Sequence, residues 1–129
     1  MKIRVVSSKN EIGNVGKNEE FIHLTFRPSN KDIFLLVQRC KNLKAIHIPT
    51  SYKKTISNST LMFLEMQNIT LMEGDVWGHR KDINEYYEIK SKVFERINEL
   101  KDAGHSKEQI ISQLSQETQL SKDLIAFLI

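Results

Sequence analysis

The sequence contains few of the residues that indicate special chemistry, with one cysteine, two prolines and one tryptophan among 129 residues. The single cysteine, Cys40, excludes an internal disulfide and a zinc site built on several cysteines, and it is typical of a reducing compartment. No apolar run approaches the roughly 20 residues that a membrane-spanning helix needs. The N-terminus also lacks the small-residue cleavage site of a signal peptide. We therefore expect a cytoplasmic protein that has no membrane partner.

Sequence fingerprints of cofactor sites are absent as well. Neither a G-x-G-x-x-G segment nor a phosphate-loop motif occurs, so a standard nucleotide site is not indicated. His23 and His47 fall on the same face of two predicted strands, but a metal ion would need a third ligand of suitable type. We predict no cofactor and no metal site.

The net charge of +3 is distributed unevenly along the chain. Residues 1–80 contain 12 Lys and Arg against 7 Asp and Glu, whereas residues 81–129 contain 7 against 9. An anionic partner would therefore bind the N-terminal part more readily than the C-terminal part.

Residues 19–54 predict a strand, a helix and a second strand, which together form one βαβ unit. The strands alternate apolar and polar residues, and the apolar run IFLLV between them has helical length. Further strands are predicted at residues 2–8 and 69–73, with a second crossover helix over residues 51–66. The fold class is thus a small, four-stranded, mainly parallel βα-repeat sheet. Its period of 20–25 residues also resembles a leucine-rich repeat, but we favour a plain α/β sheet.

Each predicted strand carries apolar residues on one face only. We assign to that face Ile3, Val5, Ile22, Leu24, Phe26, Ile46, Ile48, Ile69 and Leu71. The other face would carry Arg4, His23, Thr25, His47 and Thr70. A sheet covered on both sides would show strands that are apolar on both faces. We therefore expect helices on one face, with the second face open, ligand-facing or partly covered by the C-terminal segment.

Residues 83–129 predict three helices that dock on the α/β domain of residues 1–82. The first should run for some 18 residues from Ile83 and end at Gly104, and a capping box at Ser106 should open the second. Ser121 should cap the last. The second and third of these helices weakly resemble a helix-turn-helix. Against this, the interval from Leu114 to Leu120 is longer than the usual turn, and the C-terminal half of the chain is net acidic. Docking on the sheet, or pairing in a homodimer, is favoured over DNA binding here.

The carboxyl ends of the predicted strands are the expected place for a ligand, because parallel sheets bind ligands at this edge. Basic, hydroxyl and aromatic side chains gather there, two of the strands end in Pro followed by Ser or Thr, and helix N-termini favour anions. Ser29 could equally serve only as a helix cap. The predicted ligand-binding residues are Arg27, Ser29, Asn30, Thr50, Tyr52, Lys53, Lys54, Trp77, His79, Arg80 and Lys81.

The segment GDVWGHRKD contains the densest polar cluster of the chain. Asp75 and His79 within it could form an acid–base pair, which makes them weak candidates for catalytic residues. The tryptophan between two glycines could instead hold the helical segment against the sheet, and this structural role is the favoured one.

The stretches FRPSN, LVQRC, IPTSYKKT, LEMQ and GDVWGHRKDINEYYE resemble a family of short archaeal proteins, found mainly in methanogens and catalogued as a domain of unknown function. The resemblance covers nearly the whole chain. It implies an archaeal cytoplasmic protein, and it brings no activity, cofactor or catalytic residue.

The function expected from these observations is non-enzymatic. The protein would be a binding or regulatory protein that recognises nucleic acid or a phosphate-bearing ligand at the basic carboxyl edge of the sheet. One alternative is an enzyme that acts on a small metabolite with Asp75 and His79. Another is an assembly protein that dimerises through the C-terminal helices.

Overall fold

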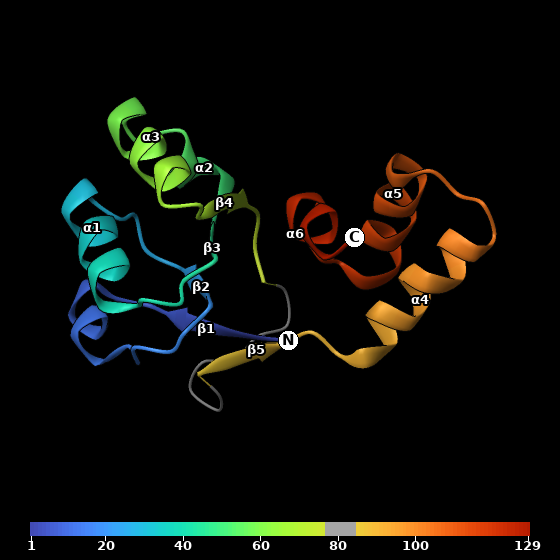
Figure 1. Cartoon of the computed structure of the whole chain (residues 1–129), viewed down its shortest axis with the longest axis horizontal. Helices are drawn as coiled ribbons and strands as arrows, with labels where there is room; N and C mark the ends of the chain where they lie inside the picture. Colours follow the sequence, from blue (N-terminus) through green and yellow to red (C-terminus); the bar gives the residue numbers. More distant parts are fainter. Residues whose placement is uncertain (77–84) are drawn as a thin grey trace.

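The protein contains one five-stranded sheet in a computed structural model that describes residues 1–76 and 85–129. The strands lie in the order β4 (Thr70–Glu73), β3 (Ala45–Ile48), β2 (Phe21–Leu24), β1 (Lys2–Val6) and β5 (Tyr86–Glu88). Strands β1 to β4 are parallel to one another, which confirms the predicted α/β class (Figure 1). Sequential pairing of β1 to β4 follows from the short βα crossovers between them.

The fifth strand was not predicted. Tyr86 and Tyr87 were assigned to a long helix beginning at Ile83, but they lie in β5, which pairs antiparallel with β1. The helix, α4, covers only Ser91–Asp102. The two tyrosines match a helical repeat and a strand equally well, and the pairing with β1 decides between them.

The strand register places the apolar face differently from the prediction at β1. Arg4 pairs with Ile22 and Val5 pairs with His23, so Ile3 and Val5 lie on the histidine face. The prediction had placed Ile3 and Val5 opposite His23, and this was wrong. All four of residues 3–6 are buried, so their alternation alone could not indicate which side faces which layer.

One face of the sheet is covered by a short 3-10 helix, η1 (Lys9–Asn14), and by α1 (Asn30–Arg39), α2 (Thr50–Lys53) and α3 (Asn58–Met66). Ile22, Leu24, Ile46 and Ile48 from the strands form the core with residues of these elements, including Leu36. A single helix was expected over residues 51–66, but the chain forms two helices. Ser57 caps the second of them by accepting a hydrogen bond from the Thr60 amide.

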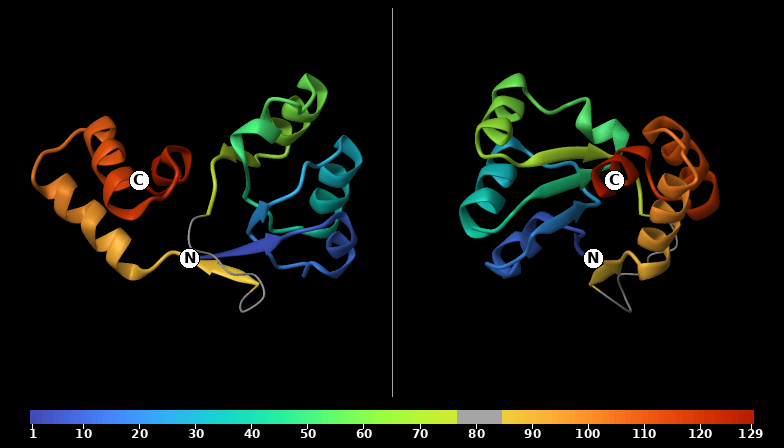
Figure 2. Two further views of the ribbon diagram at one scale, coloured as in Figure 1. Left: turned by 180° about the vertical axis from the view of Figure 1, so that it is seen from behind. Right: turned by 45° about the vertical axis from the view of Figure 1, so that its right-hand side comes forward.

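The other face of the sheet is covered by the C-terminal helices α4, α5 (Lys107–Thr118) and α6 (Lys122–Leu128). The sequence had left this face open, ligand-facing or partly covered by the C-terminal segment. The structure shows that the C-terminal segment covers it. The core here joins Ile3, Ala45 and Met72 of the sheet to Leu124 and Ile125 of α6. Both views in Figure 2 place α6 between the sheet and the hairpin of α4 and α5.

The helix boundaries in this segment follow the predicted signals. Gly104 has a positive φ of 85° just after α4, as expected for a residue that ends a helix. Ser106 and Gln109 form the predicted capping box of α5, and Ser121 caps α6 by accepting from the Leu124 amide. Among residues 1–76 and 85–129, every helix is too short or too polar to span a bilayer.

Candidate nucleic-acid interface

Helices α5 and α6 are joined by a turn of three residues, Gln119 to Ser121. Gln119 adopts the left-handed conformation, with φ of 62°. Turns of this kind often have a glycine at such a position, because glycine adopts this conformation without strain. The Thr118 hydroxyl accepts a hydrogen bond from the Leu120 amide and fixes the reversal of the chain. The objection that the turn is too long was wrong, because α5 continues for four residues beyond Leu114. This is the spacing of a helix-turn-helix.

Helix α6 occupies the position of the recognition helix, but one of its faces is packed against the sheet. Leu124 and Ile125 are fully buried, and the Phe127 ring meets Phe21 of β2 edge-on, with ring centroids 5.8 Å apart. The sequence LIAFLI is therefore apolar because α6 is enclosed by the sheet and by α5.

A network of hydrogen bonds holds the N-terminus of α6 to the sheet. His47 Nε2 lies 2.8 Å from Ser121 Oγ, and its Nδ1 lies 2.7 Å from Nδ1 of His23. The Glu73 amide at the end of β4 donates to the Asp123 carboxylate over 2.9 Å. We call His23, His47, Glu73, Ser121 and Asp123 the docking network. It joins β2, β3 and β4 to the first turn of α6.

Gly74 allows this close approach. Its φ is 142°, and a Cβ built on it would lie 2.2 Å from Ser121 Cβ and 3.1 Å from His47 Nε2. Only a residue without a side chain fits between the end of β4 and the N-terminus of α6.

Burial of His47 keeps its imidazole neutral. Desolvation lowers its pKa from 6.5 to about 4, although the carboxylates of Asp123 and Asp75 oppose the shift. His23 and His47 lie side by side, as the sequence predicted, and each residue is 1% exposed. Within the described part of the chain, no group of three or more His, Cys, Asp or Glu side chains could hold a metal ion.

The predicted ligand-binding residues of the first three strand ends gather at the carboxyl edge of the sheet. The Arg27 guanidinium lies over the Tyr52 ring at 5.2 Å from its centroid. Ser29 caps α1 through a capping box with Asp32, and Thr50 begins α2. Both hydroxyl residues thus lie at helix N-termini, and the capping role of Ser29 is confirmed. Ligand binding at this edge stays a prediction.

Two further predicted ligand residues at this edge, Asn30 and Lys54, differ in their surroundings. Asn30 accepts a hydrogen bond from the Thr60 hydroxyl over 2.8 Å, which ties α1 to α3. Lys54 is exposed, and Lys53 beside it is half-buried. Asn30 thus has a structural partner, while both ammonium groups remain candidates for binding an anion.

The residues predicted in the GDVWGHRKD segment lie mostly outside the described part of the chain. Trp77, His79, Arg80 and Lys81 belong to this group, so the predicted contact of Asp75 with His79 stays a prediction. Asp75 itself is exposed and lines a cavity of about 490 Å³ with Gly74, Gln119 and Lys122. The carboxyl edge of the sheet therefore adjoins the helix-turn-helix.

Comparison with known families assigns both parts of the chain. Residues 2–85 match the N-terminal domain of DUF1699, a family of unknown function. Residues 92–129 match the C-terminal helix-turn-helix domain of the same family. The chain belongs to the DUF1699 family. The predicted resemblance to a family of unknown function is confirmed, while archaeal origin stays a prediction. Comparison with curated proteins and with solved structures gives no match.

The helix-turn-helix domain of this DUF1699 protein suggests DNA binding, because this is the common use of the motif. The sequence indicated this motif only weakly, and Gly74 and Gln119 were not among the predicted site residues. The capping boxes were visible, but the docking network joins residues up to 74 positions apart. Only the pairing of His23 with His47 could be inferred from the strand pattern.

Proposed function

We propose that this DUF1699 protein is a non-enzymatic regulator that binds duplex DNA through its helix-turn-helix domain. The observation that carries the proposal is the α5–α6 geometry, with a turn of three residues, a left-handed residue and a capped second helix. In DNA-binding proteins of this type, the N-terminal residues of the second helix contact base edges in the major groove. Lys122 is the exposed residue at this position.

The basic carboxyl edge of the sheet would supply contacts to DNA phosphates. The helix-turn-helix domain is net acidic, so α5 and α6 alone carry too little positive charge for tight binding. The docking network places the first turn of α6 at the end of β4, at the same edge of the sheet as Lys53 and Lys54. These lysines are therefore the proposed phosphate contacts.

Entry of α6 into a major groove requires it to leave the sheet. Ser121 and Asp123, two of its first residues, already bond to His47 and to the Glu73 amide. Phe127 packs on Phe21 from the same side. A groove about 12 Å wide accepts a helix, but it cannot accept a helix covered by a sheet. We therefore assign the docked arrangement to a closed state with low affinity for DNA.

DNA binding through the sheet edge predicts a strong dependence on salt. Affinity for a duplex of about 20 base pairs, two turns of DNA, should fall steeply between about 50 and 200 mM salt. The double variant Lys53→Gln and Lys54→Gln should reduce the slope of log affinity against log salt by about 1.8, since each phosphate contact contributes about 0.9. Fluorescence anisotropy measures both quantities.

The matched control replaces Lys17 and Lys41, two exposed lysines that precede β2 and β3 at the opposite edge of the sheet, with glutamine. This variant has the same net charge as the test variant and should retain the wild-type slope. Equal slopes for all three proteins would exclude Lys53 and Lys54 as phosphate contacts. Absence of duplex binding by the wild type and by variants with a released α6 would refute the proposed function.

Release of α6 should increase the affinity for DNA. The substitution Phe127→Ala removes the edge-on contact with Phe21 and should raise affinity severalfold, because it destabilises the closed state more than the open one. Phe63→Ala is the control, since Phe63 makes a similar edge-on contact with Phe34 at 4.8 Å within the α1–α3 layer. A loss of DNA binding in Phe127→Ala with an intact fold would contradict the closed-state assignment.

A further inference from the structure

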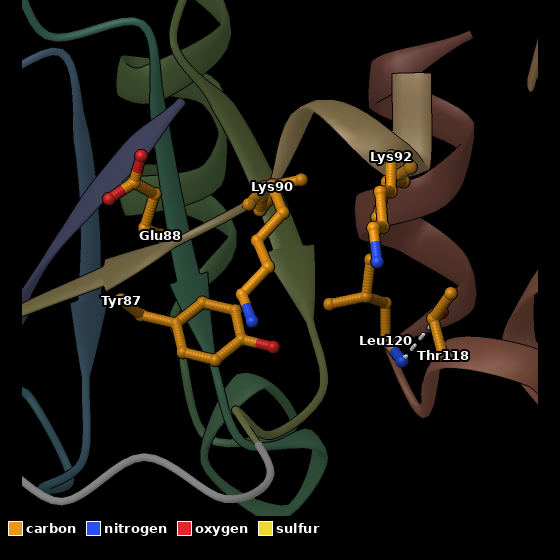
Figure 3. Close-up of a pocket in the computed structure, with 8 residues that line it drawn as sticks. Tyr87, Glu88, Lys90, Lys92, Thr118 and Leu120 are labelled. Atoms are coloured by element: carbon orange, nitrogen blue, oxygen red, sulfur yellow. Dashed lines mark hydrogen bonds between the residues drawn. The ribbon is translucent and has the colours of Figure 1, made fainter. Parts of the chain in front are cut away.

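A cavity of about 390 Å³ lies where the sheet joins the helix-turn-helix domain. Its lining comes from β5, from the linker into α4 and the first turn of α4, and from the end of α5 and the turn after it (Figure 3). Val93 and Leu120 contribute apolar surface, and Tyr87, Lys90 and Lys92 contribute polar groups. Junctions between domains are a common position for small-molecule sites, and the volume is within the range of such sites.

The polar groups that enter this junction cavity favour an anion. Figure 3 shows the ammonium groups of Lys90 and Lys92 turned into the space between the Tyr87 ring and Leu120. Glu88 is the one carboxylate among the described lining residues. It follows Tyr87 in β5, so its side chain points to the opposite face of the sheet, and Figure 3 shows it directed away from Lys90.

Two further features add to this preference. Burial raises the pKa of the Tyr87 phenol further above neutral pH, so this group carries no negative charge that would repel an anion. Lys90 is the N-cap of α4 and makes no side-chain cap hydrogen bond within the described structure. The first amides of α4 therefore present partial positive charge beside the two lysines.

We propose that the junction cavity binds a small organic anion, a phosphate ester or a carboxylate that carries a compact apolar group. The charged group contacts Lys90 and Lys92 beside the Tyr87 ring. The apolar group packs on Val93 and Leu120. Bare inorganic phosphate fills only the polar half of this site and binds more weakly.

A ligand in this position also controls the docking of α6. The cavity is lined on one side by residues of β5, the linker and the first turn of α4. On the other side it is lined by Thr118 at the end of α5 and by Leu120 in the turn before α6. A molecule that touches both sides binds the docked arrangement better than the released one and so stabilises it. This regulatory consequence rests on the proposed DNA binding, whereas ligand binding itself does not.

Isothermal titration calorimetry of the full chain with phenyl phosphate, at low ionic strength, tests the site. The double variant Lys90→Gln and Lys92→Gln should bind at least about tenfold more weakly, because it removes two charge-assisted contacts. The Lys17→Gln, Lys41→Gln control should bind as the wild type does. Equal weakening by the control, or no binding by the wild type, would overturn the assignment. Equal affinity for inorganic phosphate would overturn the organic class of the ligand.

Amide hydrogen exchange tests the effect on docking. Saturating phenyl phosphate should slow exchange at Glu73, whose amide donates to Asp123, at least severalfold, and it should lower the affinity for duplex DNA by a similar factor. Unchanged exchange in the bound protein would refute the regulatory role. If calorimetry shows binding while no variant binds DNA, the proposed function fails and the site stands. If DNA binds and phenyl phosphate does not, the site alone fails.

Discussion

The substitution Gly74→Ala is expected to release α6 from the sheet, because Gly74 is the most closely enclosed of the four described glycines. The new Cβ would lie 2.2 Å from Ser121 Cβ, inside any allowed contact, and alanine would also have to adopt a φ of 142°. Backbone strain and steric overlap each cost on the order of 1–3 kcal/mol. Neither residue 74 nor Ser121 can move aside easily. The end of β4 is fixed by pairing with β3, and Ser121 caps α6.

The release should be visible as faster amide exchange at Glu73 and Leu124, together with a severalfold gain in DNA affinity. Gly13→Ala is the matched control, because no heavy atom lies within 4 Å of its added Cβ. It should change stability by no more than about 0.5 kcal/mol. A Gly74→Ala protein with wild-type exchange at these two amides would show that the chain accommodates the methyl group without undocking. The docking network would then not be the contact that closes the protein.

Acidification is expected to destabilise the protein through His47. The folded pKa of about 4 lies below the ordinary value of 6.5, so the unfolded chain binds more protons between these values. Stability from this group is therefore complete above pH 6.5 and is lost as the pH falls to about 4. The shift corresponds to about 3 kcal/mol over the whole window. Asp123 of α6 and Asp75 after β4 favour the charged form, and burial outweighs them.

Urea unfolding at pH 7 and pH 5 measures this effect. The wild type should lose about 2 kcal/mol more than His47→Gln between the two values, because glutamine keeps a hydrogen-bonding group near Ser121 and does not titrate. His105→Gln, a change at an exposed histidine between α4 and α5, should retain the wild-type dependence. If wild type and His47→Gln lose the same stability, His47 is not buried as a neutral group.

The candidate site was predictable where local chemistry fixes it. Pro28 and Ser29 indicated a strand end and a capped helix, and Ser29 does cap α1. The alternation of Ile22, His23 and Leu24 with the same pattern in β3 placed the two histidines side by side. In each case the relevant hydrogen bonds and side chains lie within one turn or on two neighbouring strands, so the sequence pattern determines them.

The sequence by itself determined four parallel strands, the helix α1 between β2 and β3, and the caps at Ser106, Gly104 and Ser121. Tertiary structure decided the antiparallel β5, the face to which Ile3 and Val5 belong, and the docking of α6 on the sheet. A strand that is buried on both faces and a tyrosine pair satisfy more than one local pattern, so only their long-range partners distinguish the alternatives. The closed position of α6 likewise depends on Gly74 meeting Ser121 across 47 positions of the chain, a proximity that no local pattern encodes.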